Sequence, residues 1–148
     1  MKPTPKQIEK IKEGGWINAY FLIEVQGNDK EHIKKALEEM IGKLKMEQGI
    51  EIYSEKYDEI RELREKLYAY NVELKFIAKD FGRLTHAALL YSPSVVEIYE
   101  PKEIKIPVGE AQNMLVDVAN IITSLAHTIF IQSGKLRKYE PPKKQEDA

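Results

Sequence analysis

Three side chains that could do chemistry stand close together after a stretch typical of a β-strand. Asp80, Arg83 and His86 share about one and a half turns of a predicted helix. A carboxylate, a guanidinium and an imidazole at this spacing can bind a polar ligand, and an imidazole titrates near neutral pH. The same residues also fit a helix cap followed by a surface ion pair. They are the candidate ligand-binding residues, and no catalytic set is assigned.

Other patterns in the chain argue against particular chemistries. Asp80-Phe81-Gly82 matches the magnesium triplet of protein kinases, but the sequence has neither their glycine-rich loop nor their His-Arg-Asp motif. The histidines show no metal-ligand spacing, and the chain contains no cysteine. The sequence therefore predicts no metal, no cofactor and no disulfide, and it favours a non-enzymatic protein.

The charge of the chain is dense but balanced, with 23 basic and 24 acidic residues and a net charge of −1. This balance disfavours a dedicated nucleic-acid surface, which usually makes a domain basic. A nucleic-acid alternative stays open through Trp16 and Tyr20, which share one face of a predicted strand, and through the basic tail. Many Glu and Lys residues without cysteine are typical of thermophile proteins. We expect a cytoplasmic protein, without a membrane span.

Hydrophobic periodicity divides the chain into an arm, one domain and a tail. A helix that begins at Thr4-Pro5 and stops at Gly14-Gly15 makes residues 1–15 an N-terminal helical arm. Residues 16–133 are predicted to form a single α+β domain. Residues 134–148 contain Pro141-Pro142-Lys143-Lys144, and their composition predicts a disordered tail.

Within the domain, apolar residues alternate in four stretches and follow helical spacing in two. The expected order is strand, helix, strand, repeated once, which predicts an α+β, ferredoxin-like βαβ-βαβ sandwich. The predicted strands are 16–26, 50–53, 72–79 and 95–100, and the predicted helices are 29–47 and 81–91.

A charged insertion, about 55–70, separates the two halves. Acidic and basic residues recur there at i, i+3 and i, i+4, and Ile60, Leu63, Leu67 and Tyr70 form a thin apolar stripe. This pattern favours an exposed helix, with an extended hairpin as the alternative.

A long C-terminal helix, about 108–132, is the most distinctive element. Between Gly109 and Gln132 the only charged residues are Glu110 and Asp117. We therefore expect the helix to be covered on most of its circumference, by its own sheet or by a second copy of the chain. A seam with 4, 3, 4, 3, 4 spacing runs along one side, and small polar residues run along the other. The seam is Ala111, Leu115, Val118, Ile122, Leu125 and Ile129; the polar stripe is Asn113, Asp117, Asn120, Ser124 and His127.

These features favour a non-enzymatic, homo-oligomeric interaction or regulatory module, with the polar stripe as the candidate oligomer interface. The expected partner is a second copy of the chain, and a different protein partner stays open. The first alternative is a small-molecule-binding domain or small enzyme with a site near Asp80, Arg83 and His86. The second is a nucleic-acid binder. The biological process does not follow from the sequence.

Overall fold

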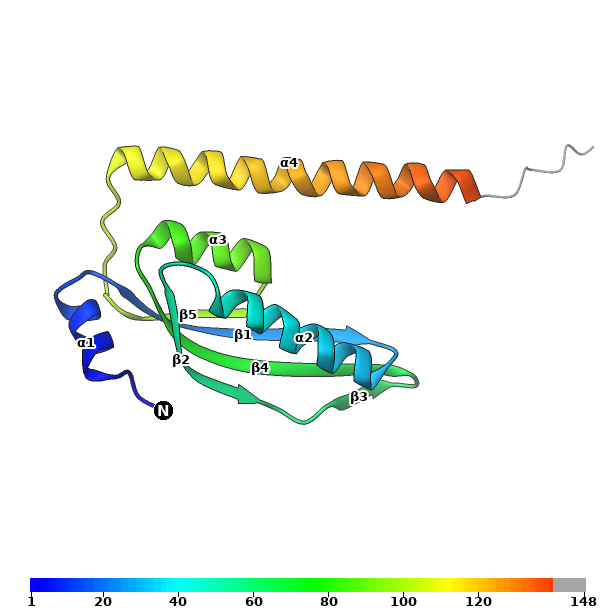
Figure 1. The fold of residues 1–148 in the computed structure, drawn as a ribbon, viewed down its shortest axis with the longest axis horizontal. Coiled ribbons are helices and arrows are strands. Elements are labelled where there is room, and N and C mark those ends of the chain that lie inside the picture. The colour runs from blue at the N-terminus through cyan, green and yellow to red at the C-terminus, as the bar shows by residue number, and fades with distance from the viewer. Residues whose placement is uncertain (140–148) are drawn as a thin grey trace, which may run out of the picture.

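The computed structural model of the chain describes residues 1–139, of which residues 135–139 are described by their backbone alone. Nine elements follow one another along these residues (Figure 1). They are α1 (Pro5–Lys12), β1 (Ile17–Gly27), α2 (Lys30–Lys45), β2 (Ile50–Tyr57), β3 (Arg61–Arg64), β4 (Leu67–Ala78), α3 (Phe81–Tyr91), β5 (Val95–Glu100) and α4 (Val108–Tyr139).

The strands form one antiparallel sheet in the order β2-β4-β1-β5, with β3 paired to β4. The long strands β1 and β4 lie at its centre and pair from Ile17↔Ala78 to Gly27↔Tyr68. The α+β class and the long C-terminal helix are therefore confirmed. The strand order agrees with the predicted ferredoxin-like arrangement, in which the first strands of the two βαβ units lie side by side.

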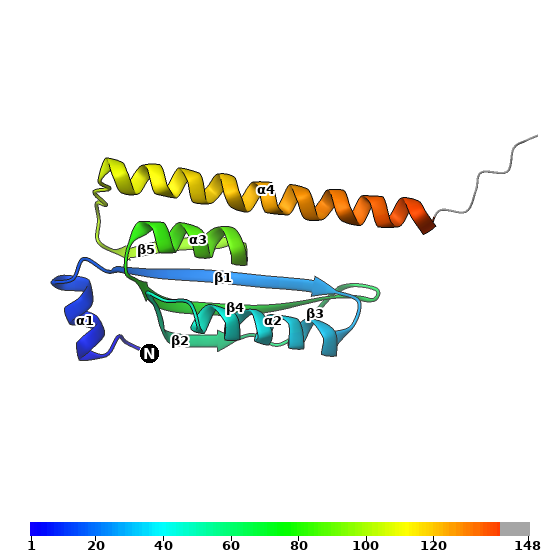
Figure 2. The same ribbon diagram turned by 45° about the horizontal axis from the view of Figure 1, so that its top comes forward.

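The hydrophobic core lies between the sheet and the helices α2 and α3. Alternate residues of β1, namely Ile17, Ala19, Phe21 and Ile23, are buried and face both helices' apolar residues. The Phe21 and Phe76 rings meet edge to face, with centroids 4.7 Å apart. The helices contribute Ile33, Leu37, Ile41 and Leu44 from α2, and Leu84, Ala87 and Tyr91 from α3. Both helices thus cover the same face of the sheet, as Figure 2 shows.

The predicted helix at 55–70 is wrong, and the alternative, an extended hairpin, is present. β2 continues to Tyr57, and β3 turns back into β4 through Lys66, whose φ is 58°. The rings of Tyr57 in β2 and Tyr70 in β4 stack with their centroids 5.6 Å apart, and this contact joins β2 to β4. A surface ion pair at i, i+4 stabilises a helix by only about 0.3–0.5 kcal/mol. Residues 55–70 gain more stability by extending the sheet beside the long strand β1. Pairing between strands therefore overrides the local charge pattern.

The long helix α4 does not lie on the sheet. Figures 1 and 2 show it along α3, on the side of α3 that faces away from the sheet, and α3 is the element with which it shares most contacts. Its C-terminal half extends beyond the end of α3. The helix continues to Tyr139, so its backbone includes residues 134–139 of the predicted tail. The rest of the predicted tail, residues 140–148, lies outside the described residues.

Candidate functional site

Asp80 and Arg83 join the start of α3 to the loop that precedes β2. Asp80 caps α3, and its Oδ1 accepts a hydrogen bond from the Arg83 backbone N–H at 2.8 Å. Arg83 Nη1 donates to Asp80 Oδ2 at 2.7 Å, and Arg83 Nε donates to the Gln48 carbonyl oxygen at 3.0 Å. These bonds occupy the carboxylate and much of the guanidinium, so both side chains have a structural role.

Gly49 is the residue that lets Arg83 approach the loop. Its φ of 76° lies in the left-handed region, where side chains are strained. A Cβ at this position would also collide with the Arg83 side chain. The close approach of the Arg83 side chain to Gly49 is further evidence that the arginine has a structural role.

His86 connects α3 to α4. Its Nδ1 lies 2.8 Å from Asp117 Oδ2, and donates to that carboxylate when the proton is on Nδ1. The sequence placed His86 in a ligand site and Asp117 in an oligomer interface. The structure brings the two together, because the first turns of α4 pack on α3.

A groove of about 630 Å³ lies beside these residues, between the end of α2, one side of α3 and the first turns of α4. The groove thus gathers the three predicted ligand-binding residues with two predicted interface residues, Asn113 and Asp117. Its charged lining consists of four acidic residues, Glu47, Asp80, Glu110 and Asp117, and two basic ones, Arg83 and His86. An excess of carboxylates disfavours a phosphate or carboxylate ligand.

The groove brings no recognisable catalytic set together. The Thr85 hydroxyl donates to the Phe81 carbonyl oxygen within α3. The His86 imidazole is paired with Asp117, and Arg83 is paired with Asp80. Among the residues whose side chains are described, no three His, Asp or Glu side chains converge as metal ligands would. The groove is therefore best explained as the junction between α2, α3 and α4.

The contact between His86 and Asp117 is expected to contribute little to stability. Their side chains are 37% and 44% exposed, and exposed pairs of this kind contribute at most about 1 kcal/mol. A double-mutant cycle with His86→Ala and Asp117→Ala, followed by urea unfolding, should return a coupling energy within that range. A coupling of several kcal/mol would show that the pair governs the position of α4.

The residues of the polar stripe of α4 do not all have the same environment in the single chain. Asp117 turns toward His86, whereas Asn113, Asn120, Ser124 and His127 are exposed to solvent. A stripe of small polar side chains on the outside of a helix is compatible with water on that side. Among the described residues, many large apolar side chains of α4 are exposed as well.

The predicted apolar seam of α4 is divided between two directions. Half-buried residues face α3, namely Ala111, Met114, Val118 and Ile121 together with Glu110 and Asp117. Large apolar residues beside them are exposed, and they include Leu115 at 71%, Ile122 at 58% and Phe130 at 78%. The expectation that α4 is covered on most of its circumference is therefore wrong for the single chain.

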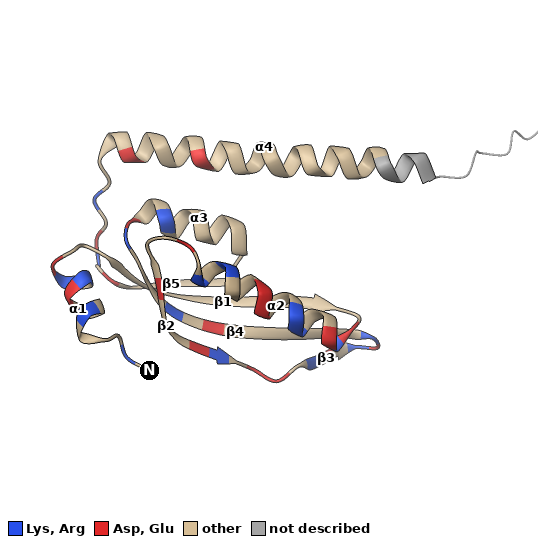
Figure 3. Ribbon diagram, in the orientation of Figure 1, with Lys and Arg blue, Asp and Glu red and all other residues tan. Residues whose placement is uncertain are grey.

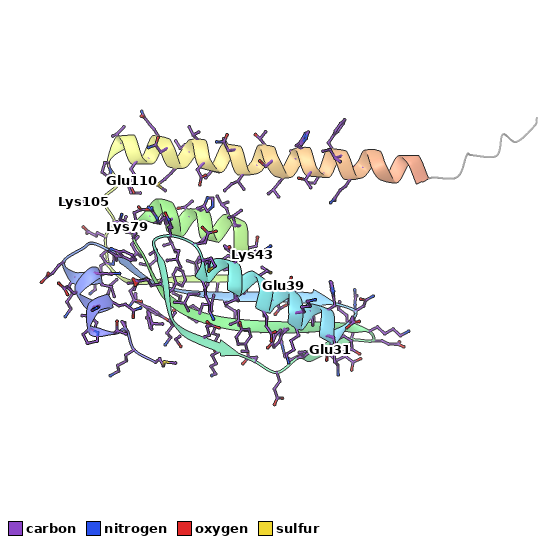
Figure 4. The ribbon with its side chains drawn as sticks, viewed as in Figure 1. Glu31, Glu39, Lys43, Lys79, Lys105 and Glu110 are labelled. Atoms are coloured by element: carbon purple, nitrogen blue, oxygen red, sulfur yellow. The ribbon has the colours of Figure 1, made fainter. Side chains whose placement is uncertain are left out.

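The exposed part of α4 lacks charge as well as a partner. Figure 3 shows acidic residues only near its start and no basic residue along the part whose side chains are described, whereas α2 carries both signs. Figure 4 shows Glu110 in the first turn, near Lys105 of the segment that leads into α4. An 18-residue window within Val108–Gly134 has a mean hydropathy of 1.7, so this part of α4 is long and apolar enough, by length and composition alone, to cross a membrane.

The face of the sheet opposite the helices carries a tyrosine cluster. Tyr20 and Tyr99 lie with ring centroids 6.5 Å apart, and Tyr20 Oη donates to Glu73 Oε1 at 2.8 Å. Carboxylates next to these rings repel a phosphate backbone. Trp16 lies apart from the cluster, with Lys10 Nζ 4.7 Å from its ring centroid. The geometry of the described residues therefore gives the nucleic-acid alternative no support, and the side chains of the basic tail lie outside those residues.

Partial burial, the hydrogen bond to Glu73 and its negative charge raise the pKa of Tyr20 from 10.0 to about 12. Burial and Glu55 raise the pKa of Tyr57 to the same value. A raised pKa in the folded state stabilises the fold fully below pH 10, and this contribution is lost as the pH rises to about 12. Absorbance of tyrosinate against pH should show a late-ionising fraction that shrinks in Tyr20→Phe. Identical titration curves would contradict the assignment.

A compact α+β sandwich with a long, largely unpartnered C-terminal helix is the class of protein that the fold defines. The chain belongs to the MJ0538 family, whose family model matches residues 18–146. The match begins in β1 and includes all of α4, so that helix is part of what defines the family. Neither a curated protein nor a solved structure shows significant similarity to the chain.

Proposed function

We propose that this protein is a non-enzymatic interaction module that self-associates through the exposed apolar side of α4. The observation that carries the proposal is the row of exposed, uncharged side chains on that helix, which is longer than the element it packs on. The row consists of Leu115, Val116, Ala119, Ile122, Thr123, Ala126, Ile129 and Phe130, and is called the α4 outer row below.

The size of this row fits a specific interface. Full burial of a large aliphatic side chain removes roughly 60–120 Å² from water, and the large members of the row are already more than half exposed. Leu115, Val116, Ile122, Ile129 and Phe130 would together bury on the order of 400 Å² per copy. With the small residues and the second copy included, the total reaches about 1,000 Å², the lower bound for a specific interface.

The chemistry of the row favours a second copy over other partners. Between Ala111 and Gly134 the helix holds Asp117 as its one charge, and Asp117 faces α3. Two identical uncharged rows meet without like-charge repulsion. A membrane is a less suitable occupant, because Asn113, Asn120, Ser124 and His127 on the same helix would have to enter lipid unpaired.

The proposal places the homodimer in the cytoplasm. A chain without cysteine forms no disulfide, which suits that reducing compartment. Ion pairs between separate elements, such as Lys10–Glu51 and Arg61–Glu24, suit a protein that works at high temperature.

Sedimentation velocity of the full chain over a wide concentration range tests the proposed function. A shift from monomer to dimer with rising concentration supports it. A single monomeric species at every concentration, or dimers that form only with added phospholipid vesicles, would overturn it.

A further inference from the structure

Large and small residues alternate along the α4 outer row at heptad spacing. Leu115, Ile122 and Ile129 recur every seven residues, and Ala119, Ala126 and Ser133 recur every seven residues between them. At about 100° per residue, these six positions fall within about 80° of the helix circumference. All six are exposed in the single chain. They form one straight seam, called the α4 seam below.

This alternation specifies the orientation of a partner helix. In an antiparallel pair centred beside residue 124, Leu115 lies opposite Ser133 of the second copy, Ile122 opposite Ala126 and Ile129 opposite Ala119. Each of these contacts then occurs twice, once on each side of the two-fold axis. Every large side chain meets a small one, which lets the layers interdigitate and the helices approach closely.

The other simple arrangements fit less well. A parallel pair would place Leu115 on Leu115 and Ala119 on Ala119, so wide layers would alternate with empty ones. An antiparallel pair centred one half-turn away, beside Ile122, would also match large with large. Cavities and overpacking both destabilise a contact. Antiparallel pairs shifted by one heptad also place large residues on small ones but match fewer of the six positions, so the register centred at residue 124 is the one that uses the whole seam.

The residues that flank the seam agree with this register. On one flank it brings Val116 beside Phe130 of the second copy and Thr123 beside its own equivalent. Val116 and Phe130 are 59% and 78% exposed in the single chain, and the contact would cover both.

The rest of the molecule leaves this side of α4 accessible. The residues that face α3, such as Met114 and Ile121, lie roughly 100° around the helix from the seam. The stripe of Asn113, Asn120 and His127 lies almost opposite the seam and stays in water. Figures 1 and 2 show no other element along the C-terminal half of the helix.

We infer that two copies of this chain pair their α4 helices antiparallel, with the two-fold axis on the seam side of the helix at the level of residue 124 and large residues seated on small ones. This inference rests on the proposed self-association and adds the orientation and register of the contact.

Cysteine cross-linking tests the register, because the natural chain contains no cysteine. Thr123→Cys should form a covalent dimer with a short bis-maleimide. Asn120→Cys, which is also an exposed polar position on α4, is the matched control and should stay largely uncoupled. Val116→Cys alone should not couple, whereas a mixture of Val116→Cys and Phe130→Cys should give the mixed dimer.

The outcomes separate the register from the self-association. Efficient coupling of Val116→Cys to itself would overturn this register and leave the proposed function standing, because an antiparallel pair would then have its two-fold axis near residue 116 of the same outer row. Coupling of Asn120→Cys but not Thr123→Cys, in a protein that sediments as a dimer, would overturn both the seam and the α4 outer row as the interface, while self-association itself would stand. A monomer by sedimentation, with no coupling of any variant, would overturn both.

Discussion

Ile122→Lys is expected to make the protein monomeric at concentrations at which the natural chain is dimeric. Ile122 lies in the middle of the α4 seam and is 58% exposed in the single chain. Loss of its burial costs about 1–1.5 kcal/mol per copy, and the two-fold axis makes the cost count twice. The ammonium adds a charge in an apolar contact. The dissociation constant should therefore rise at least about a hundredfold.

Asn120→Lys is the matched control for this substitution. It introduces the same charge half a turn away, on the polar stripe, which the proposed dimer leaves in water. Its dissociation constant in sedimentation equilibrium should stay within a few fold of the natural value. Equal effects of the two substitutions would show that the interface is not the α4 seam. The far-UV circular dichroism of both variants should match that of the natural chain, because neither position is buried in the monomer.

Phe21→Ala should cause the largest loss of folding stability. Phe21 is fully buried at the centre of β1, and its ring meets Phe76 edge to face at 4.7 Å. Truncation of a buried phenylalanine costs about 3–5 kcal/mol, because it removes apolar contacts and leaves a cavity. This is a large part of the 5–15 kcal/mol typical of a domain's total stability.

Urea unfolding in the Ile122→Lys background measures this loss without a contribution from dimer dissociation. Met46→Ala, at a residue that is 83% exposed, is the control and should change the free energy of unfolding by less than about 0.5 kcal/mol. A loss below about 1 kcal/mol for Phe21→Ala would contradict the assigned core.

Much of the fold could be predicted from local pattern. Alternating apolar residues located β1 to within a residue at each end, and the bounds of α3 and β5 were predicted correctly. Asp80 and the Ser-Pro-Ser segment mark the ends of α3 clearly. β1 and α3 bury one face against a continuous core, so their periodicity reflects their packing directly.

The hairpin at 55–70 shows where local pattern fails. Charges at i, i+3 and i, i+4 suit a helix, but Tyr57, Tyr68 and Tyr70 pack on the core from β2 and β4, and Ile60 packs on it from the connection between β2 and β3. The decisive partner is β1, which is distant in the chain and long enough to pair with all of β4. Helical spacing within the segment carries no information about that partner.

The candidate site was predicted in part. Asp80, Arg83 and His86 do lie together on one wall of a groove, as their spacing indicates. The role of Asp117 could not be read from the sequence, because periodicity orders residues around a helix without indicating which side meets its neighbour. Once Asp117 is known to face His86, the polar stripe turns outward, and the alternation of Leu115, Ala119, Ile122, Ala126 and Ile129 becomes the informative pattern.

Thiol labelling against protein concentration is the measurement that tests most directly whether a second copy covers the α4 seam. Ala126→Cys places one thiol in the seam, and Asn120→Cys places one on the polar stripe. The account predicts that the labelling rate of Ala126→Cys falls as the protein concentration rises, while that of Asn120→Cys stays constant. Rates that are independent of concentration for both variants would contradict the account, and so would protection of Asn120→Cys alone.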